Sequence, residues 1–285
     1  RIASVMPEGH PLHDLHHLLM HHSAVPYYLF FASAHRKAKV EASLGDPRTS
    51  NLTCILGLST ARLKPSPYPR ECAKCIAEER VDPGCPSYQI EHQLPTTWVC
   101  TRHGDVLSEG CVTCARSTLP GKLLCLPGYC TDPATHVVVP CTIIDDAERA
   151  DVDWLAVQGA RLITRYEDAP RDPLGAMRSA ALKRFKRCGG LDGTALAAVI
   201  EQRFSSEILV RLGLRFRDDH DSARGWHWQL LSNSTRDRLK ETAQCLIVLG
   251  ALFDDVDAYL EAPAATIVPS ENPAPAPAPE SWTAG

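Results

Sequence analysis

The feature that most constrains this chain is a pair of short cysteine motifs in its first half. Cys72 and Cys75 form a CxxC turn, and Cys100 and His103 form a CxxH turn further along. Each turn brings two metal-ligating side chains together, and four thiolate or imidazole ligands complete the tetrahedron that zinc prefers. Gly84 and several prolines between the two turns suit a loop that returns to the first turn. We therefore predict a closed structural zinc site made by these four residues, with no position left for water.

A second group of cysteines follows the first. It contains another CxxC turn and then a pair with the wider spacing CxxxxC. This pattern predicts a second zinc site, although the wider spacing leaves two alternatives open. The segment can be a simple loop, or Cys141 or His136 can replace one ligand. The predicted ligands are Cys111, Cys114, Cys125 and Cys130.

The chain has twelve cysteines among its 285 residues. An even number of cysteines also fits disulfide bonds in a secreted protein. Disulfides leave the histidine of the CxxH turn unexplained, and paired CxxC turns are typical of metal sites. We expect the cysteines outside the two groups to be small buried hydrophobic residues. They are Cys54, Cys85, Cys188 and Cys245.

Hydrophobic periodicity and composition divide the chain into four regions. We predict an N-terminal helical segment over 1–66, a zinc-finger module over 67–141, a helical domain over 150–262 and a disordered Pro/Ala-rich tail over 263–285. The expected fold class is mainly α, with small zinc-stabilised β or loop modules. The longest apolar run, 245–253, is shorter than the roughly 20 residues of a membrane span and indicates a buried helix.

Local signals place several helix boundaries in the second half of the chain. Asp172–Pro173 predicts a helix start, and Gly189–Gly190 predicts the end of that helix. Ser205–Ser206 indicates a break between two further helices. The pairs Asp145–Asp146 and Asp254–Asp255 are typical of helix caps or solvated faces and do not resemble an acid/base dyad.

We expect no enzymatic activity. The sequence contains no P-loop, GxSxG, HExxH or GxGxxG motif, and a zinc ion with four protein ligands has no open position for hydrolysis. One alternative is an enzyme that binds a metal through the N-terminal histidines. His13, His17 and His21 share one helical face there, but histidine-rich surface helices are common.

A local basic segment offers the best candidate for a nucleic-acid contact. Residues 161–190 contain eight Arg or Lys and three acidic residues, in a chain with a net charge of −4. A helix, a glycine turn and a second helix are what a helix-turn-helix needs. The helix dipole alone also favours cations at a helix C-terminus. The candidate DNA contacts are Arg178, Lys183, Arg184, Lys186 and Arg187.

The stretch RECAKCIAEERVDPGCPSYQIEHQLPTTWVCTRHGDVLSEGC contains, in order, a CxxC pair, an HQLP element, a CxxHG element and a closing cysteine. In this it resembles the TniQ/TnsD family of transposition target selectors. PYYLFFASAHRKAKVEASLG upstream and ALAAVIEQRFSSEILVRLGL downstream are more weakly similar to the same family. Ala73 stands where the family usually has proline.

The resemblance implies the same four zinc ligands. It also implies that His92–Pro95 pack around these ligands. It implies a non-enzymatic adaptor, in the bacterial cytoplasm at the nucleoid, that binds target DNA or a guide-RNA effector complex. Such an adaptor recruits the AAA+ ATPase that regulates transposition and needs no membrane. The chain starts at Arg1 without the family's usual opening, so we expect a fragment. The alternative is a transcription regulator with a zinc ribbon and a helix-turn-helix, which needs no ATPase partner.

Overall fold

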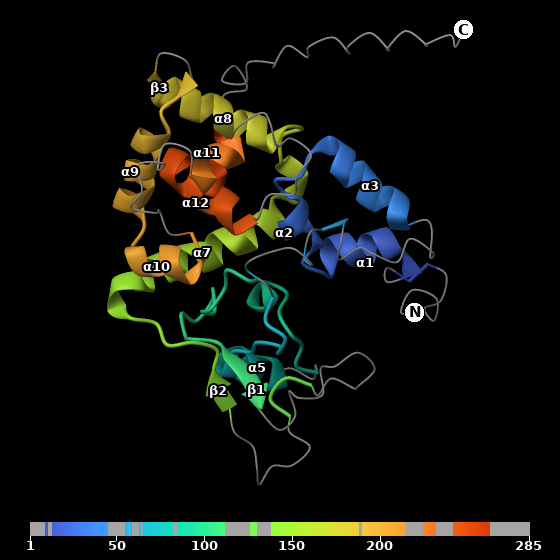
Figure 1. Cartoon of the computed structure of the whole chain (residues 1–285). Helices are drawn as coiled ribbons and strands as arrows, with labels where there is room; N and C mark the ends of the chain where they lie inside the picture. The colour runs from blue at the N-terminus through green and yellow to red at the C-terminus, as the bar shows by residue number, and fades with distance from the viewer. Residues whose placement is uncertain are drawn as a thin grey trace, which may run out of the picture.

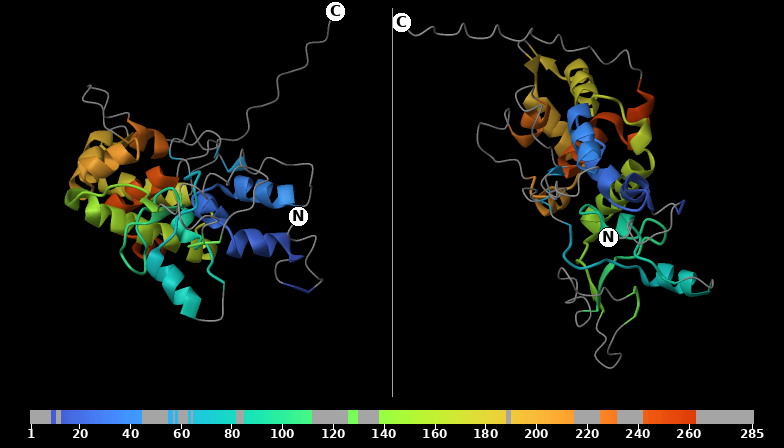
Figure 2. Two further views of the ribbon diagram at one scale, coloured as in Figure 1. Left: turned by 90° about the horizontal axis from the view of Figure 1, so that it is seen from below. Right: turned by 90° about the vertical axis from the view of Figure 1, so that its right-hand side faces the viewer.

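Helices dominate the part of the chain that the computed structural model describes. Figures 1 and 2 show a helical body with a smaller cysteine-containing module at one end and α1 and α3 on one flank. The described residues are 9–10, 13–44, 55–56, 58, 63, 65–81, 85–111, 126–129, 138–187, 190–214, 225–231 and 242–262. The predicted tail over 263–285 lies outside them.

The described helices are α1 (Leu15–His21), α2 (Val25–Leu29), α3 (Ala34–Leu44), α5 (Ala73–Val81), η3 (Glu91–Gln93), α7 (Asp146–Thr164), η5 (Tyr166–Asp168), α8 (Pro173–Arg184), α9 (Gly193–Arg203), α10 (Ser206–Arg211), α11 (Trp226–Leu231), α12 (Thr242–Phe253) and α13 (Val256–Glu261). The mainly helical fold class is therefore confirmed.

Two short antiparallel strand pairs complete the described elements. β1 (Ser108–Cys111) pairs with β2 (Val138–Pro140) in the cysteine module, and β3 (Lys186–Arg187) pairs with β4 (Gly190–Leu191) between α8 and α9. An isolated bridge joins Glu71 to Ser108. The segment that leads into the first cysteine turn is thus tied to β1.

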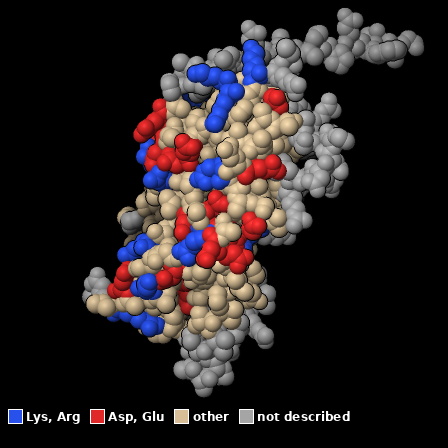
Figure 3. All heavy atoms as spheres, turned by 90° about the vertical axis from the view of Figure 1, so that its left-hand side faces the viewer, with Lys and Arg blue, Asp and Glu red and all other residues tan. Residues whose placement is uncertain are grey.

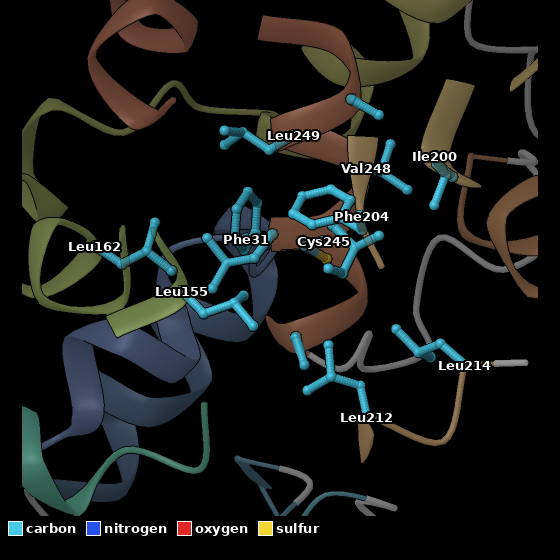
Figure 4. Close-up of a cluster of buried hydrophobic side chains, with 14 of the residues drawn as sticks. Phe31, Leu155, Leu162, Ile200, Phe204, Leu212, Leu214, Cys245, Val248 and Leu249 are labelled. Atoms are coloured by element: carbon cyan, nitrogen blue, oxygen red, sulfur yellow. The ribbon is translucent and has the colours of Figure 1, made fainter. Parts of the chain in front are cut away.

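Helix α12 forms the centre of the body. Cys245 and the residues around it are buried, as the apolar run predicts for a helix that is hydrophobic on all sides. Figure 4 shows its side chains packed against residues of α7, α9 and the segment after α10. A Cβ atom at Gly250 would lie 2.6 Å from Trp154 and 2.8 Å from Phe204, so glycine permits this close packing. No helix in the described ranges is long and apolar enough to cross a membrane.

Most predicted helix boundaries agree with the structure. The Asp172 side chain accepts a hydrogen bond from the Gly175 N–H at the start of α8, and Pro173 occupies the first turn. Ser205 caps α10 after the predicted break. Asp145 and Asp255 are the N-cap residues of α7 and α13, so the aspartate pairs belong to helix caps.

The segment predicted to form a helix-turn-helix differs in detail from the prediction. Helix α8 ends at Arg184 instead of continuing to Gly189–Gly190. The hairpin of β3 and β4 then separates it from α9. The Phe185 carbonyl accepts a hydrogen bond from the Asp192 N–H, so the chain closes a hairpin at the position where we expected a tight glycine turn.

Candidate metal centre

Two equivalent turns hold the predicted ligands. Cys72 directly precedes α5, Cys75 lies in its first turn, and Cys100 to His103 form a turn after the extended residue Val99. Backbone N–H groups hydrogen-bond to the sulfur of the first cysteine in each turn. They come from Lys74 and Cys75 toward Cys72, and from Arg102 and His103 toward Cys100.

The four donor atoms have the spacing of a tetrahedral metal site. The Sγ atoms of Cys72, Cys75 and Cys100 lie 3.5, 3.4 and 3.5 Å from Nδ1 of His103. Cys75 Sγ lies 3.6 Å from Cys100 Sγ. Zinc–ligand bonds of about 2.3 Å to sulfur and about 2.0 Å to nitrogen place tetrahedral donors roughly 3.5–3.8 Å apart. The sulfurs are too far apart for a disulfide, which needs about 2.05 Å. This group can hold a metal ion.

The centre is shielded from water and has its own small core. Cys72, Cys75 and Cys100 are each 3% exposed or less, and Leu107 packs against them. Gly104 closes the second turn with φ +69°, a conformation that suits glycine. Its N–H donates to the Cys100 carbonyl over 2.8 Å. The tight exit expected after the CxxH turn is confirmed.

Metal binding at these thiols must displace protons. Burial raises the pKa values of Cys75 and Cys100. Burial also acts on Cys72, but backbone hydrogen bonds from Cys75 and Lys74 outweigh it, so the pKa of Cys72 lies below its usual value. Since the metal binds thiolates, the buried neutral thiols must release protons when it enters.

Glu78 orients the histidine ligand, and the sequence analysis missed it. Its Oε1 lies 2.8 Å from Nε2 of His103. A carboxylate only accepts hydrogen bonds, so Nε2 carries the proton and Nδ1 faces the three sulfurs. The hydrogen bond to Glu78 raises the pKa of His103. Glu78 lies one helical turn after Cys75 in α5, and that spacing was the available signal.

We expect Glu78→Gln to weaken metal affinity by about 10- to 100-fold, the usual effect of losing the carboxylate partner of a histidine ligand. Competition with a chromophoric chelator measures the affinity. Asp105→Asn is the matched control, because the Asp105 side chain pairs with Lys74 on the surface. Its only contact with a ligand residue is the backbone carbonyl that accepts from the Cys100 N–H, and asparagine keeps it. Equal affinities for both variants would contradict the role of Glu78.

The HQLP element holds the loop between the two turns. The Gln93 side chain accepts from the Arg70 N–H and donates to the Arg70 carbonyl, over 2.9 and 2.8 Å. Leu94 is fully buried, and its carbonyl accepts from the Arg70 guanidinium. His92 and Pro95 are buried too. The residues His92, Leu94 and Pro95 are thus buried, but Leu94 packs in the core of the helical body and not in the cluster of ligand cysteines.

The second predicted zinc site remains a prediction. Cys114, Cys125 and Cys130 lie outside the described residues, and Cys111 is described only as part of the β1 backbone. The described turn 126–129 is anchored to the first module, because the Gly128 N–H donates to Glu71 and its carbonyl accepts from Arg80. Two of the predicted ligands, Cys125 and Cys130, directly precede and follow this turn in the sequence.

The remaining cysteines have different surroundings. Cys245 is fully buried, as predicted. The prediction for Cys85 is wrong, because this residue is exposed. It begins an extended segment whose Ser87 and Gln89 make polar bonds to Glu79, and these bonds keep the segment at the surface. Cys54 and Cys188 lie outside the described residues.

The other candidate residues do not join the centre. Arg178, Lys183 and Arg184 lie on α8 and Lys186 on β3, and the Arg187 side chain lies outside the description. Of the N-terminal histidines, the rings of His17 and His21 lie 4.5 Å apart. Within the described ranges, only the first cysteine group has the spacing of a metal site.

The fold and the site together define a helical protein with a Cys3His centre that can bind a metal. A comparison with protein-family models and a comparison with curated proteins each found no match to this chain. The TniQ/TnsD resemblance therefore remains a prediction from its motifs. The function proposed below is therefore argued from the residues of this site.

Proposed function

We propose that this chain is a zinc-stabilised, non-enzymatic adaptor in DNA transposition, which binds target DNA and recruits an AAA+ regulator. The observation that carries the proposal is that the residues behind the resemblance meet in one place. The four ligand residues form one cluster, and Gln93 and Leu94 hold the loop between the two turns through Arg70. The motif is thus one structural unit.

Zinc is the metal that best suits this donor set. Three thiolates and one imidazole in a tetrahedron favour zinc among the common divalent metals. All four positions are filled by protein atoms, which is the pattern of a structural site. The proposed role of the ion is to hold the two turns of the cysteine module together.

The basic end of α8 and β3 supports the DNA-binding part of the proposal. Lys183 and Lys186 are exposed there. Positive side chains on one face are the electrostatic footprint of a nucleic-acid-binding protein. A guide-RNA effector complex is a polyanion as well, so the same surface can serve either kind of target.

Three measurements on the purified chain test the proposal. Elemental analysis should find zinc, fluorescence anisotropy should detect binding to duplex DNA, and the chain should capture the AAA+ ATPase encoded beside it. DNA binding without ATPase capture would favour the transcription regulator. Absence of both would overturn the proposal. Cys100→Ser, which removes a ligand, should lose zinc, whereas the exposed Cys85→Ser should keep it.

A further inference from the structure

Several positive side chains in the described residues are neutralised by acidic partners. Around the cysteine centre, Lys74 and Arg102 pair with acidic residues at 2.9 Å. On the helical body, Arg165 pairs with Asp168 and Asp257. These cations are already satisfied and leave little charge for a ligand. Further paired cations are Arg149, Arg161, Arg203 and Arg211.

The end of the body formed by α8 and β3 is different. Lys183 and Lys186 are exposed and Arg178 is half-buried. None of the three side chains makes an ion pair or hydrogen bond with another described residue. Figure 3 shows Lys and Arg side chains extending from the end of the molecule that carries α8 and β3 in Figure 1, with acidic side chains beside and below them. Their charge is available to an anionic partner.

Arg184 lies in the same basic run but has a structural role. Its guanidinium donates to the Ala251 carbonyl in the last turn of α12 over 3.2 Å, and it lies over the Phe185 ring. A cation at this position also suits the negative end of the α12 dipole. Arg184 therefore ties α8 to the central helix, unlike the two lysines.

Helix α9, the second helix of the predicted helix-turn-helix, has an acidic N-terminus that disfavours the major groove. A recognition helix presents its N-terminal residues to the major groove. In α9, Asp192 caps this end by accepting hydrogen bonds from the N–H groups of Thr194 and Ala195, both over 3.1 Å. The exposed residues of the helix are Thr194, Ala198, Glu201 and Gln202. A carboxylate at the N-terminus and another on the outer face repel DNA phosphates.

We propose that the α8–β3 end, through Lys183, Lys186 and Arg178, binds the phosphate backbone of duplex DNA without reading its sequence. The two exposed members are lysines, compact point charges that contact phosphates without the bidentate geometry by which arginine reads guanine, whereas Arg178 is half-buried. This inference rests on the proposed function and specifies how its DNA is held. Selection of a particular site would then depend on a partner.

Salt dependence of binding tests the phosphate surface. Log affinity falls linearly with log salt, with a slope of about −0.9 for each phosphate contact. We expect Lys183→Gln/Lys186→Gln to reduce the slope by about 2, with the same loss of affinity for every duplex sequence. Anisotropy titrations of two unrelated duplexes between about 50 and 200 mM salt measure both quantities.

Two matched variants separate charge from folding. Lys39→Gln removes an exposed lysine on the distant helix α3 and should leave the slope unchanged. Arg184→Gln should lower the melting temperature and also leave the slope unchanged. An unchanged slope in the double lysine variant, or sequence-selective binding by the wild type, would overturn this inference while the adaptor proposal stands. No duplex binding at any salt would overturn the DNA-binding part of both proposals.

Discussion

Replacing Cys100 by serine is expected to abolish metal binding at the Cys72/Cys75/Cys100/His103 centre and to unfold the cysteine module. Cys100 is 1% exposed and contacts two other ligands. The local core around the ligands consists of three of the ligand cysteines and Leu107, so little apolar area remains to hold the two ligand turns together without the metal. Leu94, Trp98 and Val99 pack in the core of the helical body instead. In zinc-finger peptides the metal contributes an apparent free energy of about 10–16 kcal/mol, which is free energy of folding.

Elemental analysis and limited proteolysis check this expectation. The Cys100→Ser chain should contain one metal equivalent less than the wild type and should be cleaved rapidly within 65–111. The helices of the body should resist cleavage, because the core around α12 is built mostly by residues of those helices. Cys85→Ser is the control, since Cys85 is exposed and lies outside the cluster. Full metal content and slow cleavage in Cys100→Ser would show that the centre is not a structural metal site.

The parts of the fold that sequence could predict depend on local chemistry. A CxxC or CxxH turn fixes two ligands within one turn of chain, so only the pairing of the two turns was a long-range inference. The apolar stripe of α7 and the cap at Asp172 also follow from neighbouring residues. An all-apolar α12 can only lie in the core.

The features that sequence could not predict depend on distant partners. Glu78 shows its role only when His103 is folded against it. From the sequence alone, Arg184 looks like one more surface cation in the basic run. Its hydrogen bond to the Ala251 carbonyl follows only from the packing of α8 on α12. The hairpin after α8 likewise needs β4 to pair with β3. Local helix signals carry none of this information.

Arg211 joins the cysteine module to the helical body, and its replacement by methionine is expected to destabilise the protein by about 3–5 kcal/mol. Its guanidinium forms two hydrogen bonds to Glu148, one of them 2.9 Å long. It also donates to the Ile143 carbonyl over 2.9 Å and lies 5.6 Å from the centre of the Trp98 ring. Glu148 is only 2% exposed, so the variant leaves a buried carboxylate without its partner.

The pH dependence of this loss identifies its cause. The hydrogen bond from Arg211 lowers the pKa of Glu148. A carboxyl group with a lowered folded pKa stabilises the fold fully above its unfolded pKa of about 4.3, and that contribution is lost as pH falls through the folded pKa. The difference in unfolding free energy between wild type and Arg211→Met should therefore be largest near neutral pH and should narrow below about pH 4.

A double variant separates the ion pair from simple packing. Arg211→Met/Glu148→Met removes both charges, so it should recover much of the stability lost in Arg211→Met, because a well-packed apolar pair can replace a buried ion pair. Chemical denaturation of the single and double variants measures the coupling free energy. Metal content should stay at the wild-type value in Arg211→Met, since Arg211 contacts none of the four ligands in the described residues. A pH-independent loss without recovery in the double variant would assign the effect of Arg211 to its packing on Trp98 and not to the ion pair.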